Sequence, residues 1–135
     1  MEEMLTAADC MAEKLITIHQ DASLDEAISL LLSHRISGMP VVGDNGELMG
    51  VISEQDCLKS FVESKYHNTP IASVKDVMSK EVASVGSDTD VLTIAELFSK
   101  NAYRRLPVLK NSRLVGQVSR RDVLSVIEKW MKPVE

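Results

Sequence analysis

Apolar and polar positions follow one pattern along this chain, and the pattern occurs twice. Each occurrence opens with a short helical turn and an extended apolar segment. It continues with an amphipathic helix and two strands joined by a polar turn, and it closes with a second amphipathic helix. Apolar residues three and four apart indicate the helices, whereas short apolar runs bounded by turn residues indicate the strands. The order βαββα, written twice, predicts an α/β fold.

The predicted elements fall at matching places in the two halves. In the first half they are a helical turn at 6–9, an extended segment at 15–18, a helix capped by Ser23, a hairpin from 39–42 to 50–52, and a closing helix through 57–62. In the second half they are a turn at 73–76, an extended segment at 82–85, a helix capped by Asp90, a hairpin from 106–109 to 116–118, and a helix through 123–131. Pro40 and Pro107 stand near the start of a hairpin strand. They predict that this strand lies at a sheet edge or begins at the proline.

An internal duplication explains the recurrence. Residues 67 positions apart match up to the hairpin turn, as Pro40 and Pro107 do, and beyond that turn the offset is 66. The change falls in a polar turn, where a difference of one residue is tolerated. We therefore predict a first repeat at 6–65, a linker at 66–72 and a second repeat at 73–132. Because one repeat alone buries little surface, we expect the two to share one core about an approximate two-fold axis.

Composition and charge narrow the function classes. The 135 residues are 44% hydrophobic and 26% charged, the balance of a globular protein. The formal net charge is −5 and no long basic run is present, so we do not expect a nucleic-acid partner. No apolar run approaches the length of a membrane span, and the acidic start does not resemble a secretory signal. We expect a cytoplasmic protein without membrane insertion.

Residue types that carry catalytic or metal-binding chemistry do not form recognisable patterns. The three histidines lack ligand spacing, and Cys10 and Cys57 are isolated, so we expect neither a metal site nor a disulfide. The sequence also lacks a glycine-rich phosphate loop and a nucleophile elbow. These features predict that the protein is not an enzyme.

One motif in each repeat joins a strand to the closing helix. A glycine-containing strand is followed by Ser53-x-x-Asp56 in the first repeat and by Ser119-x-x-Asp122 in the second. A hydroxyl and a carboxylate at a helix N-terminus suit the phosphate and ribose of a nucleotide, but they also form an ordinary capping box. The same letters occur elsewhere in the chain, where only capping is expected. The place of the motif behind a hairpin strand therefore carries more information than its letters.

The segments around these motifs resemble the CBS domain (cystathionine-β-synthase domain). In the first repeat the resemblance rests on Ile-Ser-Gly-Met-Pro-Val-Val at 36–42 and on Gly-Val-Ile-Ser-Glu-Gln-Asp at 50–56. In the second it rests on Tyr-Arg-Arg-Leu-Pro-Val at 103–108 and on Gly-Gln-Val-Ser-Arg-Arg-Asp at 116–122. Two copies imply a CBS pair with pseudo-two-fold symmetry, which covers nearly the whole chain.

The resemblance implies a regulatory module, here a free-standing one, that signals to an effector protein whose identity the sequence does not reveal. CBS pairs typically bind adenine nucleotides or other adenosyl ligands in the clefts between their repeats. They commonly dimerise into a disc of four repeats. The implied ligand is AMP, ADP or ATP, with S-adenosylmethionine or NADH as further options, and no cofactor is required. An energy-sensing role and a homodimer are expectations from the same resemblance.

The resemblance also implies which residues form the clefts. In the main cleft, Asp122 would hold the ribose hydroxyls and Ser119 would meet the phosphate. The residues predicted to bind nucleotide there are Ile16, Ile36, Ser37, Arg104, Arg105, Gln117, Ser119, Arg121 and Asp122. A second, weaker cleft would use Val51, Ser53, Asp56, Ala83 and Tyr103.

Charge distinguishes the two motifs. Arg120 and Arg121 follow Ser119, and Arg104 and Arg105 lie upstream in the same repeat. Guanidinium groups near one helix N-terminus favour an anion, although they could instead pair with acidic residues on the surface. In the first repeat a glutamate follows the serine, and its charge is unfavourable beside a phosphate. We therefore expect the second motif to be the better nucleotide site.

Two departures from the family pattern leave a second interpretation open. Gln117 replaces the apolar residue that the family has beside the adenine, and Gln20 and Ser87 stand where it often has a proline. The alternative is a ligand-free dimerisation or scaffolding module with degenerate clefts. For Trp130, on the apolar face of the last helix, we expect packing, with a dimer face that includes Trp130 and Met131 as the alternative.

Overall fold

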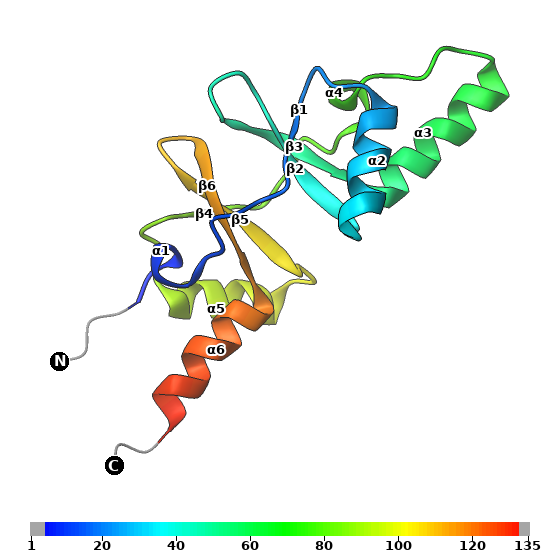
Figure 1. The fold of residues 1–135 in the computed structure, drawn as a ribbon. Coiled ribbons are helices and arrows are strands. Elements are labelled where there is room, and N and C mark those ends of the chain that lie inside the picture. Colours follow the sequence, from blue (N-terminus) through cyan, green and yellow to red (C-terminus); the bar gives the residue numbers. More distant parts are fainter. Residues whose placement is uncertain (1–4, 133–135) are drawn as a thin grey trace. The chain divides into compact units, whose positions relative to one another are not determined.

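The computed structural model describes residues 5–132, whose contacts divide the chain into two compact units. We call residues 16–82 the central unit, for its place in the sequence. The terminal unit joins the residues up to Leu15 to those from Ala83 onward. Each unit has a three-stranded sheet whose one face carries the unit's two longer helices (Figure 1). Within the described range, none of the helices has the length and apolarity that a membrane crossing requires.

The central unit contains the predicted elements in the predicted order. They are β1 (Ile18–His19), α2 (Leu24–His34), β2 (Gly38–Val42), β3 (Leu48–Ser53), α3 (Glu54–His67) and α4 (Val74–Val77). β1 pairs in parallel with β2, and β2 pairs antiparallel with β3. Ser23 caps α2, as predicted. α3 continues to His67, into the segment predicted as a linker, and ends at Asn68, whose φ of 51° places it in the left-handed region.

The terminal unit repeats this arrangement. Its elements are α1 (Ala7–Cys10), β4 (Val85–Gly86), α5 (Val91–Lys100), β5 (Arg105–Lys110), β6 (Arg113–Ser119) and α6 (Arg120–Met131). The sheet order is β4-β5-β6, and Asp90 caps α5 as predicted. The extended segments predicted at 15–18 and 82–85 reach their ladders only at Ile18 and Val85. The residues before them connect the two units, so they have no neighbouring strand to extend.

The opening segment of each repeat joins the sheet of the other repeat. In the terminal unit, Ala12 and Gln117 of β6 exchange two backbone hydrogen bonds, of 2.9 and 3.0 Å. In the central unit, Ser79 and Val51 of β3 exchange a matching pair, of 2.9 and 3.0 Å. The compact units therefore differ from the sequence repeats by a reciprocal exchange of these opening segments.

This exchange explains the glycine that opens each motif. A Cβ atom at Gly50 would lie 2.5 Å from the carbonyl oxygen of Ser79. A Cβ atom at Gly116 would lie 3.0 Å from the carbonyl oxygen of Ala12. A side chain at Gly50 would push the exchanged segment away from the strand, and one at Gly116 would crowd it.

Buried apolar residues form two cores, one in each unit, rather than the single shared core that we predicted. The central core consists of Ile18, Leu24, Ala27, Leu31, Met39, Val41, Ile52, Cys57 and Val74. The terminal core consists of Ala7, Val85, Val91, Ile94, Leu106, Val108, Val118, Val123 and Val126. The exchanged segments contribute Val74 to the central core and Ala7 to the terminal one, so each core needs residues from both repeats.

Pro40 and Pro107 lie inside the middle strand of their sheets, so the prediction of an edge or first position was wrong. Pro40 stands opposite Val51, whose backbone groups bond to Ser79 instead. The proline nitrogen therefore faces the β1 side, where the ladder begins only at Val41. No ladder hydrogen bond is lost, which explains why a central strand tolerates proline here. Pro107 occupies the matching position in β5.

Candidate functional site

The Ser119–Asp122 motif forms the corner between β6 and α6, which we call the second corner. Ser119 ends β6 and caps α6: its Oγ accepts the N–H of Asp122 at 3.1 Å, and its own N–H donates to Oδ2 of Asp122 at 2.8 Å. Both residues are half-buried. Among the hydrogen bonds of residues 5–132, none uses Oδ1 of Asp122 or the hydroxyl hydrogen of Ser119. This corner can therefore offer a ligand one carboxylate acceptor and one hydroxyl donor.

The Ser53–Asp56 motif forms the equivalent corner between β3 and α3, which we call the first corner. Ser53 caps α3 with the same two bonds to Asp56, of 3.2 and 2.9 Å. Its hydroxyl also donates to Oδ2 of Asp56 at 2.9 Å. The hydroxyl hydrogen that the second corner leaves available is thus used internally in the first.

Four arginines surround the second corner. Arg105 of β5 is the cross-strand partner of Ser119, so both side chains lie on the same face of the sheet. The N–H of Arg120 donates to the carbonyl oxygen of Arg104 at 3.3 Å, which brings these two residues together at the start of α6. All four arginine side chains, including that of Arg121, are exposed, and none of the ion pairs within residues 5–132 involves them. Pairing with surface acids, the alternative left open by the sequence, does not occur in the described part of the chain.

The first corner has the same backbone contacts but different side chains. Gly38 is the cross-strand partner of Ser53, and the N–H of Glu54 donates to the carbonyl oxygen of Ser37 at 2.9 Å. With Gln55, these residues replace the four arginines by one carboxylate. The N-terminus of α3 therefore carries a local charge that opposes an anion, whereas that of α6 favours one.

The remaining predicted site residues are divided between the units. The terminal unit contains Ala83, Tyr103 and Gln117, and the central unit contains Ile16, Ile36, Ser37 and Val51. Four of them are partly buried against the core of their own unit: Ile16, Ile36, Ala83 and Tyr103. That these residues combine with the motif of the other repeat around one ligand stays a prediction.

A cysteine that the sequence did not connect with the site lies near Asp122. Cys10 belongs to α1, which contacts α6 in the terminal unit. Burial raises the pKa of the Cys10 thiol above its ordinary value of 9.0, and the charges of Asp122 and Asp9 raise it further. Burial also raises the pKa of Cys57, together with the acidic residues at the start of α3. Both thiols are therefore neutral at pH 7, and neither is an activated nucleophile.

Both halves of the chain match the same protein-family model. The family model described as the CBS domain matches residues 7–63 and 74–129. These two ranges contain both corners and the strands that lead into them.

Relatives of known sequence cover the chain to different extents. The CBS domain-containing protein DDB_G0289609 of Dictyostelium discoideum is 30% identical over 133 residues, which cover 92% of each chain. The uncharacterized protein MJ1225 of Methanocaldococcus jannaschii is 29% identical over 119 residues, which cover 88% of this chain and 41% of that protein. In the inosine-5'-monophosphate dehydrogenase of the same organism, the matching region covers 23% of the protein. This chain thus spans less than half the length of the latter two relatives.

Solved structures of similar fold include complexes with adenosyl compounds. CBSX2, a CBS-pair protein of Arabidopsis thaliana, was solved in complex with AMP and superposes with a TM-score of 0.80 at 28% identity, covering 95% of this chain and 99% of that one. The CBS domain pair of protein MJ0100 was solved with 5'-methylthioadenosine and S-adenosyl-L-methionine. It superposes with a TM-score of 0.73 at 26% identity, with the same coverage.

Proposed function

Because this chain belongs to the CBS domain family, we propose that it is a non-enzymatic regulatory module that binds an adenosine-containing ligand and signals its presence to a partner protein. The AMP complex of CBSX2 and the adenosyl complexes of MJ0100 support the class of ligand. The observation that carries the proposal for this chain is the second corner, where a hydroxyl donor and a carboxylate acceptor lie at a helix N-terminus beside four arginine residues that form no ion pair within residues 5–132.

Each group of the second corner suits a different part of a nucleotide. Oδ1 of Asp122 would accept the ribose hydroxyls, because a carboxylate oxygen binds hydroxyl donors strongly. The hydroxyl of Ser119 and the N-terminal amides of α6 would donate to the phosphate. Arg105, opposite Ser119 in the sheet, and Arg120, next to it in the chain, would add charge-assisted hydrogen bonds worth roughly 1.5–3 kcal/mol each where solvent is excluded.

The charge of the second corner favours a phosphorylated ligand. AMP, ADP and ATP carry a phosphate that guanidinium groups bind with two parallel hydrogen bonds. S-adenosylmethionine lacks a phosphate and carries a sulfonium cation, which the arginines would repel. We therefore place AMP, ADP and ATP before S-adenosylmethionine, with NADH, which also contains phosphates, between them. Competition between AMP and ATP at this corner would make the module an energy sensor.

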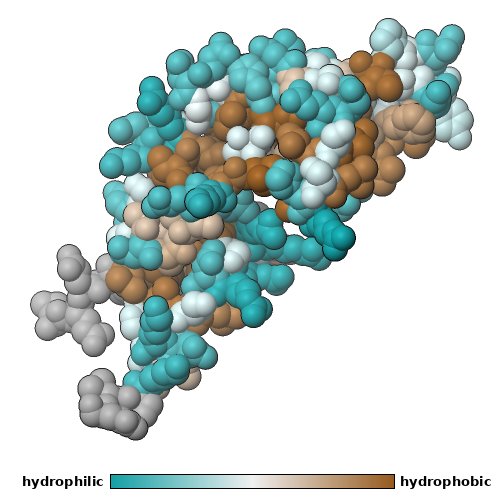
Figure 2. All heavy atoms as spheres, viewed as in Figure 1, coloured by the Kyte–Doolittle hydropathy of each residue, from teal (hydrophilic) through white to brown (hydrophobic). Residues whose placement is uncertain are grey.

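A second function, dimerisation or scaffolding without a ligand, is supported by the helical face of the central unit. A groove of about 240 Å³ between α2 and α3 is lined by six apolar residues and one acidic residue: Ile28, Leu31, Leu32, Cys57, Leu58, Phe61 and Glu54. Leu32 is 70% exposed and Leu58 67% exposed, and hydrophobic residues are visible on this side of the unit (Figure 2). The occupant that we propose is a second copy of the chain, because the matching helices α5 and α6 also expose leucines, at Leu92 and Leu124.

Titration calorimetry with AMP, ADP, ATP, NADH and S-adenosylmethionine tests the proposed function. We expect saturable binding of at least one adenine nucleotide. At 100 times its dissociation constant, such a ligand should raise the free energy of unfolding by roughly 2.7 kcal/mol. Ribose 5-phosphate, which lacks the base, is the control ligand and should bind more weakly. If none of the adenosyl ligands binds at millimolar concentration, the sensor proposal is wrong. A dimeric mass in solution would then favour the scaffold, and a strict monomer would contradict both.

A further inference from the structure

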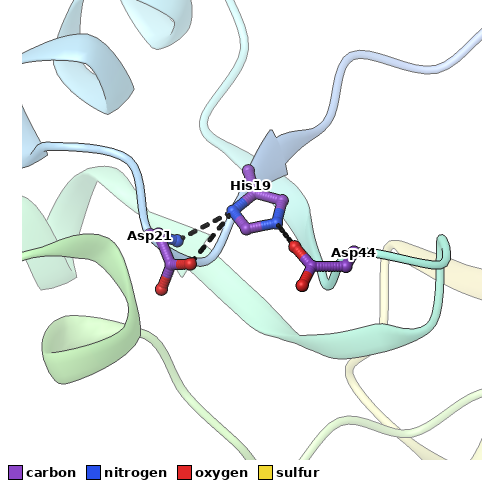
Figure 3. A group of neighbouring side chains, drawn as sticks. All are labelled: His19, Asp21 and Asp44. Atoms are coloured by element: carbon purple, nitrogen blue, oxygen red, sulfur yellow. Dashed lines mark hydrogen bonds and ion pairs between the residues drawn. The ribbon is translucent and has the colours of Figure 1, made fainter.

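Three side chains of ligand-forming type meet at one end of the sheet in the central unit (Figure 3). His19 is the last residue of β1, Asp21 lies in the turn that follows, and Asp44 lies in the turn between β2 and β3. Nε2 of His19 is 2.7 Å from Oδ1 of Asp44, and Nδ1 is 3.8 Å from Oδ2 of Asp21. The imidazole therefore lies between two carboxylates, one of which comes from a position 25 residues further along the chain.

The fold holds this cluster in place through neighbouring backbone and charge contacts. The N–H of Asp21 donates to Nδ1 of His19 at 3.1 Å, which orients the ring. Lys75 of α4 pairs with Oδ1 of Asp21 at 3.3 Å, while its own N–H donates to the carbonyl oxygen of Gln20 at 3.0 Å. The exchanged segment that contains Lys75 thus supports the position of Asp21 and leaves its Oδ2 directed toward the histidine (Figure 3).

We propose that His19, Asp21 and Asp44 bind a divalent transition-metal cation such as Zn²⁺. One donor atom from each residue lies within 4.8 Å of the other two. The two carboxylates face opposite nitrogens of the ring, so a cation would bind one ring nitrogen and one carboxylate would rotate toward it, to within the roughly 2.0–2.2 Å at which zinc binds nitrogen and oxygen ligands. Asp44, which is 83% exposed and pairs only with His19 among the described residues, can make this rotation, whereas Lys75 holds Asp21, which is 59% exposed; water can complete the coordination. A nitrogen ligand beside two carboxylates suits zinc, cobalt or nickel better than magnesium or calcium.

Charge balance also favours a cation in this cluster. The two carboxylates carry two negative charges, and the Lys75 ammonium offsets one of them. A divalent cation would bind the remaining negative charge together with the imidazole, and the nearby ammonium would weaken that binding by repulsion. Removing the Lys75 charge should therefore strengthen cation binding, whereas a role of the cluster in turn structure alone predicts no such gain.

The terminal unit offers an internal comparison. Gly86, Asp88 and Asn111 occupy the positions that His19, Asp21 and Asp44 hold in the central unit. They line an open hollow with neither the imidazole nor the second carboxylate. The proposal therefore predicts one bound cation per chain, in the central unit.

The test is calorimetric titration of Zn²⁺, Co²⁺ and Mg²⁺ into the chelator-treated full chain, in the absence of nucleotides. We expect one equivalent of Zn²⁺ or Co²⁺ to bind and Mg²⁺ to bind far more weakly. His19→Gln keeps a hydrogen-bonding side chain and should abolish binding, whereas His67→Gln at the end of α3 should leave it unchanged. Asp44→Asn, which replaces a ligand carboxylate by a neutral amide, should weaken binding strongly, and Lys75→Met should strengthen it. A double Cys10→Ser, Cys57→Ser variant should still bind, which separates this site from the thiols.

A gain of function adds a readout that the loss of folding cannot mimic. Gly86→His with Asn111→Asp rebuilds the cluster in the terminal unit, where Asp88 is already present, and should add a second equivalent of bound Zn²⁺. In this variant the Asp88 side chain must shift, because a Cβ atom at Gly86 would lie 2.9 Å from its Oδ1. Equal Zn²⁺ binding by the wild type and His19→Gln would overturn the proposal. So would the lack of any Zn²⁺ binding at millimolar concentration, which would leave the cluster as a hydrogen-bonded turn.

Discussion

The two Ser-x-x-Asp corners share a backbone and differ in the side chains around it. In both, the serine ends a hairpin strand and caps a helix, and the aspartate completes the capping box. In both, the first helical N–H reaches back to the residue before the hairpin, at 2.9 Å in the first corner and 3.3 Å in the second. Duplication has therefore preserved the structure of the corner twice within one chain.

The difference lies in charge and in one hydroxyl hydrogen. The second corner has four arginines where the first has Ser37, Gly38, Glu54 and Gln55. The hydroxyl of Ser53 donates to Asp56 at 2.9 Å, whereas no such bond uses the Ser119 hydroxyl within the described residues. The shared letters of the motif thus explain the fold, and the letters around them distinguish a corner suited to an anion from one that is not.

Replacing the aspartate of each motif in turn should give the largest difference in AMP affinity between the two corners. Asp122→Ala removes the carboxylate that we assign to the ribose and should weaken AMP binding by about 10- to 100-fold, because it deletes hydrogen bonds to a charged group. Asp56→Ala should change AMP affinity little. Calorimetric titration of the two variants measures the ratio directly.

Asp76→Ala is the matched control for both aspartate variants. Oδ2 of Asp76 accepts a hydrogen bond from the Ser73 hydroxyl at 2.9 Å, so this substitution also deletes a carboxylate at a helix start. α4 does not follow a hairpin strand, and the variant should bind AMP like the wild type. A greater loss of affinity in Asp56→Ala than in Asp122→Ala would show that the first corner is the main site.

Exchanging the charged residues between the corners should have the next largest effect. Arg120→Glu combined with Arg121→Gln gives the start of α6 the two residues that begin α3, and should weaken AMP binding by about tenfold, or about 1.4 kcal/mol. Both side chains are exposed, so the free energy of unfolding should change by less than about 0.5 kcal/mol. The reciprocal pair, Glu54→Arg with Gln55→Arg, should strengthen any binding at the first corner.

Titrations at several salt concentrations test whether the exchanged arginines act through their charge. Salt screens exposed charges over about 10 Å at 0.1 M, so wild-type affinity should fall as salt is added, and more steeply than that of the exchanged variant. Equal salt dependence in the two proteins would mean that these arginines do not contact the phosphate.

The hydrophobic pattern predicted the elements of the fold because helical and strand periodicities are local. It could not predict which opening segment belongs to which core. Ala7 and Val74 occupy equivalent positions in the two repeats, and either could fill an apolar gap of similar shape. Their exchange depends on where the chain passes between units, which no local pattern encodes. Pro40 is likewise tolerated in a middle strand because β1 pairs with β2 only from Val41 onward, and no local pattern predicts where that pairing begins.

The sequence brought together the candidate-site residues that are neighbours along the chain or that the family resemblance placed there, such as Arg104 and Arg105, which the hairpin brings to Ser119 and Arg120. Ser119, its aspartate and the following arginines lie within one turn of a helix, so their spacing was enough to bring them together. The contact between α1 and α6 that brings Cys10 near Asp122 results from the segment exchange and left no signal in the spacing. The cluster around His19 was missed for the same reason, because Asp44 lies on a distant turn.

The smallest expected change in AMP affinity comes from replacing the two motif serines, which distinguishes helix capping from ligand binding. Ser119→Ala and Ser53→Ala each remove a helix cap, and each should lower the free energy of unfolding by about 1 kcal/mol. Urea denaturation measures this cost, and threonine at either position, which keeps the cap, should restore most of it. Only Ser119→Ala should also weaken AMP binding, by a few-fold, because only that hydroxyl has a hydrogen available for the phosphate. If Ser119→Ala loses stability but keeps its AMP affinity, the serine is a cap alone, and the asymmetry between the corners lies entirely in the arginines and Asp122.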